Sequence, residues 1–371
     1  MDNTLNFKSP RAWGETFDTF KGLYSMKDYI TVPRESNKRD VRNTKNKICR
    51  FCNRTKNETT FKLLSHKIPK LMGNRFWYSE DECDKCNALF QEYETHLGDF
   101  FGLDRPLQKV KGGNKYPKFK SPGQKLEVSV GEFYNSSGVY VKQNSKENEH
   151  FEYNKETGEL KITTKITPFI PIYVYKALLK IALSILPKKE MISYQDLLPF
   201  ILNPASTYIS TCPIAGYMLH DDARFEFQSL IFEKNNSNLK LPTHFFCFYW
   251  LSNIIILHLP NHKNDIWIKD EYIEVPVPPP LFLNVDDEHL EKLPIKYFFE
   301  DFNSIDPVRD RLREIVLQVK PETMRELLGK NMDTGEVVEL GEFDISKING
   351  LFISKDKDTP TIYFDETNRK I

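Results

Sequence analysis

Four cysteines in two Cys-x-x-Cys pairs constrain this chain more than any other feature. Cys49 and Cys52 form the first pair, and Cys83 and Cys86 form the second. Each pair can place two thiolates at the tip of one turn, and two such pairs complete a tetrahedron around a metal ion. Because four sulfur ligands leave no coordination position for water, we expect a structural Zn²⁺ ion. Its binding free energy would help to fold a segment too small to bury its own core.

The rest of the chain is long enough to form a substantial fold around this cysteine segment. Its 371 residues allow two or three domains, and 40% hydrophobic residues are typical of a globular protein. No apolar run reaches the ~18 residues of a membrane span, and the polar N-terminus does not resemble a signal peptide. Six cysteines without an export signal favour metal ligands or core residues over disulfides. We therefore predict a cytoplasmic location and no membrane partner.

The hydrophobic pattern divides the chain into four consecutive segments. Residues 1–45 predict an N-terminal arm, 46–102 the cysteine segment, 103–125 a basic linker, and 126–371 a larger α+β domain. The following elements are expected from periodicity, caps and turn residues: a short helix near Thr16–Leu23, β runs at Thr59–Leu64 and Phe76–Ser79, and a helix from Asp84 to Gly98.

The larger domain shows both periods, which predicts a mixed fold. Ile172–Leu186 is the strongest helix, and Lys176 and Lys180, one turn apart, define its expected polar face. The other expected elements are hairpins over 126–141 and 151–164, a helix at Tyr194–Ile201, strands at Phe225–Glu233, Thr243–Leu259 and Ile266–Val277, a proline-rich spacer at Pro276–Pro280, and a helix at Arg309–Val319.

Three short motifs lie within the cysteine segment. They are Ser65-His66-Lys67-Ile68-Pro69, then Gly73-Asn74, then Asn87 directly after Cys86. With its bracketing cysteine pairs, the stretch 49–98 resembles the HNH endonuclease family. The resemblance implies a ββα-metal fold and single-metal hydrolysis of a phosphodiester bond, usually in DNA. It also implies that His66 is the general base, that Asn74 braces the hairpin, and that Asn87 is the last motif residue, although Asn74 is equally suited to a simple turn.

The chemistry of phosphodiester hydrolysis needs a base to activate water and a cation to neutralise developing charge. At ~100° per residue, Asn87 and Glu94 share one helix face, with Gln91 as a third choice. We therefore expect Asn87 and Glu94 to bind a catalytic Mg²⁺ or another divalent ion. HNH nucleases commonly carry Asp or His immediately before the base, whereas this chain has Ser65, a weak ligand that leaves the identity and affinity of the metal open.

A DNA partner would need positive charge, which the chain has locally and not in total. The formal net charge is zero, but residues 103–125 are rich in basic side chains, with Tyr116 and Phe119 among them. This segment is either a phosphate-binding surface or a solvated linker. The candidate DNA-binding residues are Arg105, Lys109, Lys111, Lys115, Lys118 and Lys120.

These features predict an α+β protein in which a zinc-bound ββα-metal HNH module precedes a larger mixed α+β domain. The predicted function is a metal-dependent DNA endonuclease in restriction or anti-phage defence, whose C-terminal domain serves sensing, assembly or targeting. The alternative is a zinc-knuckle nucleic-acid-binding or partner-docking protein with a degenerate or partner-activated core, which Ser65 favours. A homo-oligomer or a defence-system partner protein is possible in either case.

Overall fold

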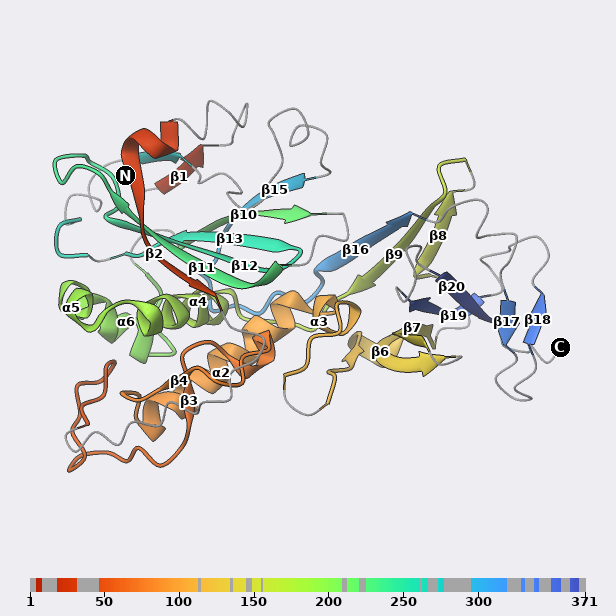
Figure 1. Ribbon diagram of the computed structural model, residues 1–371, viewed down its shortest axis with the longest axis horizontal. Coiled ribbons are helices and arrows are strands. Elements are labelled where there is room, and N and C mark those ends of the chain that lie inside the picture. Colours follow the sequence, from red (N-terminus) through yellow and green to blue (C-terminus); the bar gives the residue numbers. More distant parts are fainter. Residues whose placement is uncertain are drawn as a thin grey trace. The chain divides into compact units, whose positions relative to one another are not determined.

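The computed structural model shows a mixed α+β protein with several sheets and few helices (Figure 1). It describes residues 5–8, 19–31, 47–112, 115–133, 136–144, 149–154, 156–208, 212–219, 225–260, 262–265, 273–276, 295–318, 328–330, 337–339, 348–354 and 361–366. The chain forms two compact units. Unit 1 comprises Met1–Gly98 and Phe169–Pro307, and unit 2 comprises Asp99–Pro168 and Val308–Ile371. The four consecutive segments expected from the sequence do not coincide with these units, because the middle of the chain groups with the cysteine segment.

Within the cysteine segment, two very short strands precede one long helix. Strand β3 (Ser65–His66) pairs antiparallel with β4 (Tyr78–Ser79), and helix α2 (Asp84–Phe101) follows. The short 3₁₀ helix η1 (Lys70–Met72) lies between the strands and ends at Gly73, whose φ of 88° suits glycine. Helix α2 continues past Gly98 to Phe101, three residues beyond the expected end.

The strand expected at Thr59–Leu64 is wrong, because this stretch is irregular. Its polar groups bond instead to the carboxylate of Asp84, the first residue of α2. The Thr60 hydroxyl donates at 2.5 Å, and the backbone amide of Leu63 donates at 2.8 Å. A carboxylate at a helix N-terminus competes here with strand pairing for the backbone amides.

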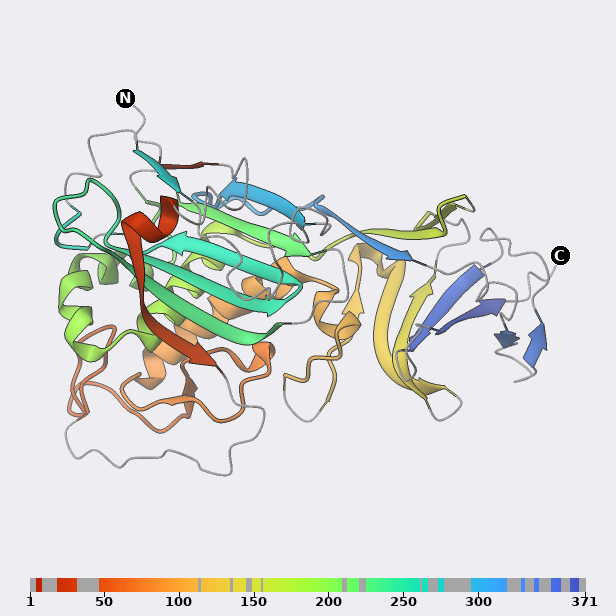
Figure 2. The same cartoon turned by 45° about the horizontal axis from the view of Figure 1, so that its top comes forward.

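The large sheet of unit 1 has six strands in the order β15-β10-β13-β12-β11-β2, drawn side by side in Figure 2. The single strand expected at Thr243–Leu259 is two strands, because Leu251 has a φ of 58° and Ser252 turns the chain into a hairpin. The strands are β2 (Tyr24–Thr31), β10 (Pro213–Leu219), β11 (Phe225–Lys234), β12 (His244–Leu251), β13 (Asn253–His258) and β15 (Ile295–Asp301). A separate parallel pair joins β1 (Leu5–Lys8) to β14 (Ile273–Pro276), and the rest of the expected strand at Ile266–Val277 and spacer at Pro276–Pro280 lies outside the described residues.

Helix α4 (Pro171–Ile185) confirms the strongest helix expected from the sequence and is buried on nearly every side. In Figure 1 it lies between the six-stranded sheet and the cysteine segment. The expected polar face is wrong, because Lys176 and Lys180 are 0% and 1% exposed. Three short helices complete the layer: α5 (Lys188–Met191), η3 (Ile192–Leu197) and α6 (Leu198–Leu202). Among the described residues, no helix combines the length and apolar character that a bilayer crossing requires.

Unit 2 consists mainly of two sheets, whose strands pair antiparallel except for one parallel pair in the larger sheet. Both expected hairpins are confirmed, as β6 (Leu126–Phe133) pairs with β7 (Ser136–Gln143) and β8 (Phe151–Asn154) pairs with β9 (Glu159–Lys165). The helix expected at Arg309–Val319 is wrong, because Leu312–Gln318 forms β16 and pairs with β9, with Ile315 opposite Ile162. Its β-branched residues pack on a neighbouring strand, and this tertiary pairing outweighs a weak helical pattern.

The larger sheet of unit 2 has the order β18-β17-β20-β19-β7-β6-β5, and the smaller one has the order β16-β9-β8. The elements are α3 (Asp104–Leu107), β5 (Phe119–Lys120), η2 (Pro122–Gln124), β6 (Leu126–Phe133), β7 (Ser136–Gln143), β8 (Phe151–Asn154), β9 (Glu159–Lys165), β17 (Leu328–Lys330), β18 (Val337–Glu339), β19 (Ile348–Ser354) and β20 (Thr361–Glu366).

Candidate functional site

The four paired cysteines converge on one point. Their sulfur atoms all lie within 4.8 Å of one another, with 3.8 Å between Cys49 and Cys86 and 3.7 Å between Cys52 and Cys83. A tetrahedron with Zn–S bonds of ~2.3 Å has sulfur-to-sulfur edges of about 3.8 Å. The geometry of this four-cysteine cluster therefore fits a metal ion such as Zn²⁺, as the spacing predicted.

Local hydrogen bonds hold both cysteine turns in place, and in the second turn the Asn87 amide donates to the Cys83 carbonyl at 2.9 Å. The Cys49 amide donates to the Arg54 carbonyl at 2.9 Å, and Asn53, with a φ of 56°, donates back to the Cys49 carbonyl at 2.9 Å. Cys86 lies in the first turn of α2. The hydrogen bond between Cys49 and Cys86 lowers the pKa of Cys49 to about 5 and raises the pKa of Cys86. When all four cysteines are deprotonated, their negative charges repel one another, and a divalent cation bound between them would offset that repulsion.

Asn74 uses its whole side-chain amide to fix the loop between β3 and β4. Its Nδ2 donates to the carbonyls of Ile68 at 2.7 Å and Trp77 at 3.0 Å. Its Oδ1 accepts from the amides of Phe76 at 3.1 Å and Trp77 at 2.9 Å. At 1% exposure, Asn74 is a structural brace whose polar atoms are all engaged within this loop.

His66 has one ring nitrogen without a partner. Its Nε2 is buried and has no hydrogen-bond partner among the described residues. Burial, followed by the charges of Lys70 and Lys180, lowers the pKa of His66 to about 4. The imidazole is only 7% exposed, and with this lowered pKa it is neutral at physiological pH.

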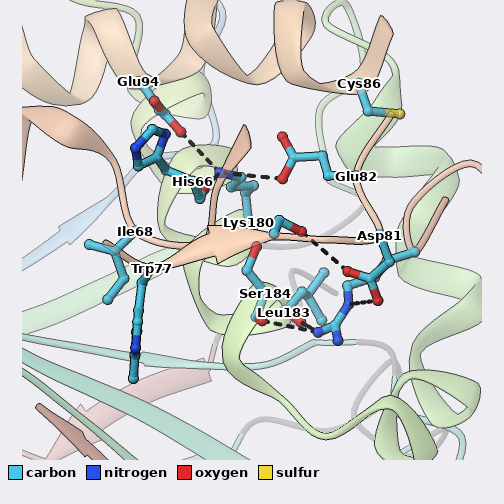
Figure 3. A network of polar contacts seen from close by, with 12 residues as sticks. His66, Ile68, Trp77, Asp81, Glu82, Cys86, Glu94, Lys180, Leu183 and Ser184 are labelled. Carbon is cyan, nitrogen blue, oxygen red and sulfur yellow. Dashed lines mark hydrogen bonds and ion pairs between the residues drawn. The ribbon is translucent and has the colours of Figure 1, made fainter. Parts of the chain in front are cut away.

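A buried lysine from α4 reaches into the cysteine segment beside His66 (Figure 3). The Lys180 ammonium donates to the His66 carbonyl at 2.5 Å and to Glu94 Oε1 at 3.1 Å, and it lies 3.7 Å from Glu82 Oε2. Burial opposes its charge, but Glu82 and Glu94 raise the pKa of Lys180 above its usual value. Burial likewise raises the pKa of Glu82 to about 7.

Sequence reasoning missed both Glu82 and Lys180. A signal for Lys180 was present, since two lysines stand one turn apart in a helix that is otherwise apolar. Nothing local marked Glu82, whose role depends on the packing of α4 against the cysteine segment.

The expected ligands of a catalytic ion are only partly brought together. Glu94 lies at the Lys180 ammonium beside the His66 carbonyl. Asn87, 8% exposed, is two helical turns earlier on α2, about 10 Å along the axis. Ser65 Oγ is buried and has no hydrogen-bond partner among the described residues.

The expected DNA-binding side chains belong to unit 2, where several already have acceptors or acidic partners. Lys118 and Lys120 lie 3.4 Å and 3.6 Å from the carboxylate of Glu127 on β6. The other placements are as follows: Arg105 is half-buried in α3 near Asp99, Lys109 donates to the Ser137 carbonyl, Lys111 lies over the Tyr116 ring, and Lys115 is exposed.

No protein-family model, curated protein or solved structure matches this chain. Function is therefore inferred from the side chains of the site, because a fold by itself does not specify an activity.

Proposed function

We propose that this chain is a metal-dependent DNA endonuclease that hydrolyses phosphodiester bonds, with His66 as the general base. The observation that carries the proposal is His66 Nε2, which has no hydrogen-bond partner among the described residues and belongs to the segment bracketed by the four-cysteine cluster. The resemblance of residues 49–98 to HNH endonucleases supports the same role. The four-cysteine cluster would hold Zn²⁺ as a structural frame, since it offers no open coordination position.

In this mechanism, His66 Nε2 accepts a proton from the attacking water. The lowered pKa keeps the imidazole neutral at physiological pH and also makes it a weaker base, and the Leu64 backbone, which raises the pKa, favours the imidazolium as it forms. A bound Mg²⁺ or another divalent ion would supply positive charge to the scissile phosphate. Glu94 is the proposed acidic ligand beside His66, and Asn87 is the proposed amide ligand. Asn74 keeps the loop between β3 and β4 in the conformation that presents His66.

Affinity for DNA would come from lysines in unit 2. Lys115, Lys118 and Lys120 are exposed, and their positive charges suit phosphate contacts without base readout. A role in restriction or anti-phage defence, in the cytoplasm, would require the remaining sheets to sense, assemble or target. A second copy of the chain or a defence-system protein would then be the partner.

Specific observations favour a second candidate function. His66 is only 7% exposed, Lys180 engages Glu94, and Ser65 replaces the acidic or histidine ligand usual before the base. These features suit a zinc-framed nucleic-acid-binding or partner-docking protein whose nuclease core is degenerate or is activated by a partner.

Plasmid cleavage separates these candidates. Zinc-loaded protein is incubated with supercoiled DNA and Mg²⁺, Mn²⁺ or Ni²⁺, and DNA binding is measured separately by fluorescence anisotropy. His96→Ala is the matched control for His66→Ala, since His96 lies on α2, accepts a hydrogen bond from the Ile170 amide and packs on the Tyr173 ring. Cleavage that His66→Ala abolishes and His96→Ala retains supports the nuclease. Binding without cleavage under every ion supports the second candidate.

A further inference from the structure

Three oxygen-bearing groups from separate elements converge on the Lys180 ammonium. Glu94 comes from α2, the main-chain carbonyl of His66 comes from β3, and Glu82 precedes the zinc ligand Cys83. The distances from Lys180 Nζ are 2.5 Å to the His66 carbonyl, 3.1 Å to Glu94 Oε1 and 3.7 Å to Glu82 Oε2. Two carboxylates and one carbonyl are a typical ligand set for a hard divalent cation.

The ammonium satisfies this oxygen cluster incompletely. The Glu82 side chain is 0% exposed, and neither of its oxygens has a hydrogen-bond partner among the described residues. Figure 3 shows its carboxylate directed toward Lys180, but the 3.7 Å separation is too long for a hydrogen bond. A buried carboxyl group normally has several hydrogen-bond partners, and Glu82 has none among the described residues.

We propose that Glu82, Glu94 and the His66 carbonyl form a divalent-cation site, for which the Lys180 ammonium and a metal ion compete. A divalent ion balances both carboxylates and bonds directly to the Glu82 oxygens, and water completes its coordination. Lysine suits the role of a displaceable occupant, because its ammonium is carried on a flexible four-carbon stem. Metal binding therefore expels Lys180 from the site.

This competition gives the chain two states. When the Lys180 ammonium occupies the site beside His66, no metal ion is bound there to contact a phosphate. With a metal in place, the same carboxylates carry a Lewis acid next to the base. The functional meaning of the site rests on the proposed hydrolysis, whereas its occupancy by a metal can be measured without DNA.

Amine labelling of the wild-type, zinc-loaded chain tests the competition. A short pulse of an acetylating reagent is applied without and with millimolar Mn²⁺, and each lysine is quantified by mass spectrometry. Lys176 is the matched control: it lies one turn away on α4, is equally buried, and donates to the carbonyls of Asn203 and Ser206 at 2.7 Å. We expect Mn²⁺ to raise Lys180 labelling at least ~5-fold and to leave Lys176 unchanged, since only Lys180 shares ligands with the ion.

Two variants test the ligands directly. Lys180→Met should tighten Mn²⁺ binding at least ~10-fold, measured by electron paramagnetic resonance, and adding Glu82→Gln should cancel that gain. Lys180 labelling that stays at its metal-free level overturns the proposal even if the variants fail to fold. Mn²⁺-dependent labelling of Lys180 without plasmid cleavage would support the divalent-cation site and contradict the endonuclease activity. Plasmid cleavage without a change in Lys180 labelling would support the endonuclease activity and contradict the divalent-cation site.

Discussion

Arg50 provides a sharp test of how the cysteine segment is attached to α4. Its Nη1 donates to the carbonyls of Leu183, Ser184 and Leu186 at 2.7, 3.1 and 2.9 Å, and its Nε donates to Asp81 at 3.2 Å. The guanidinium therefore caps the C-terminal end of α4, where carbonyls lack helical partners. Arg50→Met removes all four bonds and keeps most of the apolar stem.

The expected cost is about 3 kcal/mol in the free energy of unfolding of unit 1. Breaking a buried pair by removing one partner costs about 3 to 5 kcal/mol. Two features favour the lower end of this energy range. Lys188 still lies 3.3 Å from Asp81, and the adjoining groove of 470 Å³ lets water reach the freed groups.

Tryptophan fluorescence during denaturant unfolding isolates this effect, because all four tryptophans lie within the residue ranges of unit 1. Arg54→Met is the matched control, as Arg54 is exposed on the same turn between the cysteine pairs. A loss for Arg50→Met within ~0.5 kcal/mol of the loss for Arg54→Met, the usual range of surface changes, would refute the capping role.

Three further predictions concern the four-cysteine cluster, the Asn74 side chain and the buried His258. Cys83→Ser should lose bound zinc while Cys247→Ser, in the core of β12, keeps it; elemental analysis that finds no zinc in the wild-type chain would remove the structural metal. Asn74→Ala should cost about 2 to 3 kcal/mol in the free energy of chemical unfolding, and Asn74→Asp, which keeps the acceptor, clearly less; equal losses would mean that the two bonds accepted by Oδ1 contribute nothing. Burial lowers the pKa of His258 to about 4, so the folded state resists protonation and stability falls as pH drops below about 6.5, by about 2 kcal/mol at pH 5. Burial lowers the pKa of His66 and His244 to about 4 as well, so His258→Gln should reduce the loss of stability at pH 5 by about 2 kcal/mol without abolishing it, and an unchanged pH profile of stability would contradict the assignment.

The features that the sequence predicted well are those with local causes. Cysteine spacing determines which sulfurs can share one ion, and alternation with a turn predicts the hairpin of β6 and β7. Helix α4 likewise follows from a long apolar run that ends before Pro187.

The features that were missed depend on contacts between distant segments. Residues 312–318 become a strand because β9 is available to pair with them. Lys180 was expected on the surface but is buried, because α4 packs against the cysteine segment. Lys180 and His66, which meet there, are 114 residues apart in sequence. No local pattern contains that packing, and it alters the surroundings of Glu94 as well.

The role of His66 is tested most directly by single-turnover cleavage of a labelled DNA duplex at saturating protein. The rates to compare are those of the wild type and His66→Ala, under the divalent ion that supports the fastest cleavage. General-base catalysis predicts a fall of about 10²- to 10⁴-fold with DNA affinity and zinc content unchanged. Equal rates for the two proteins would contradict the assignment of His66 as the base.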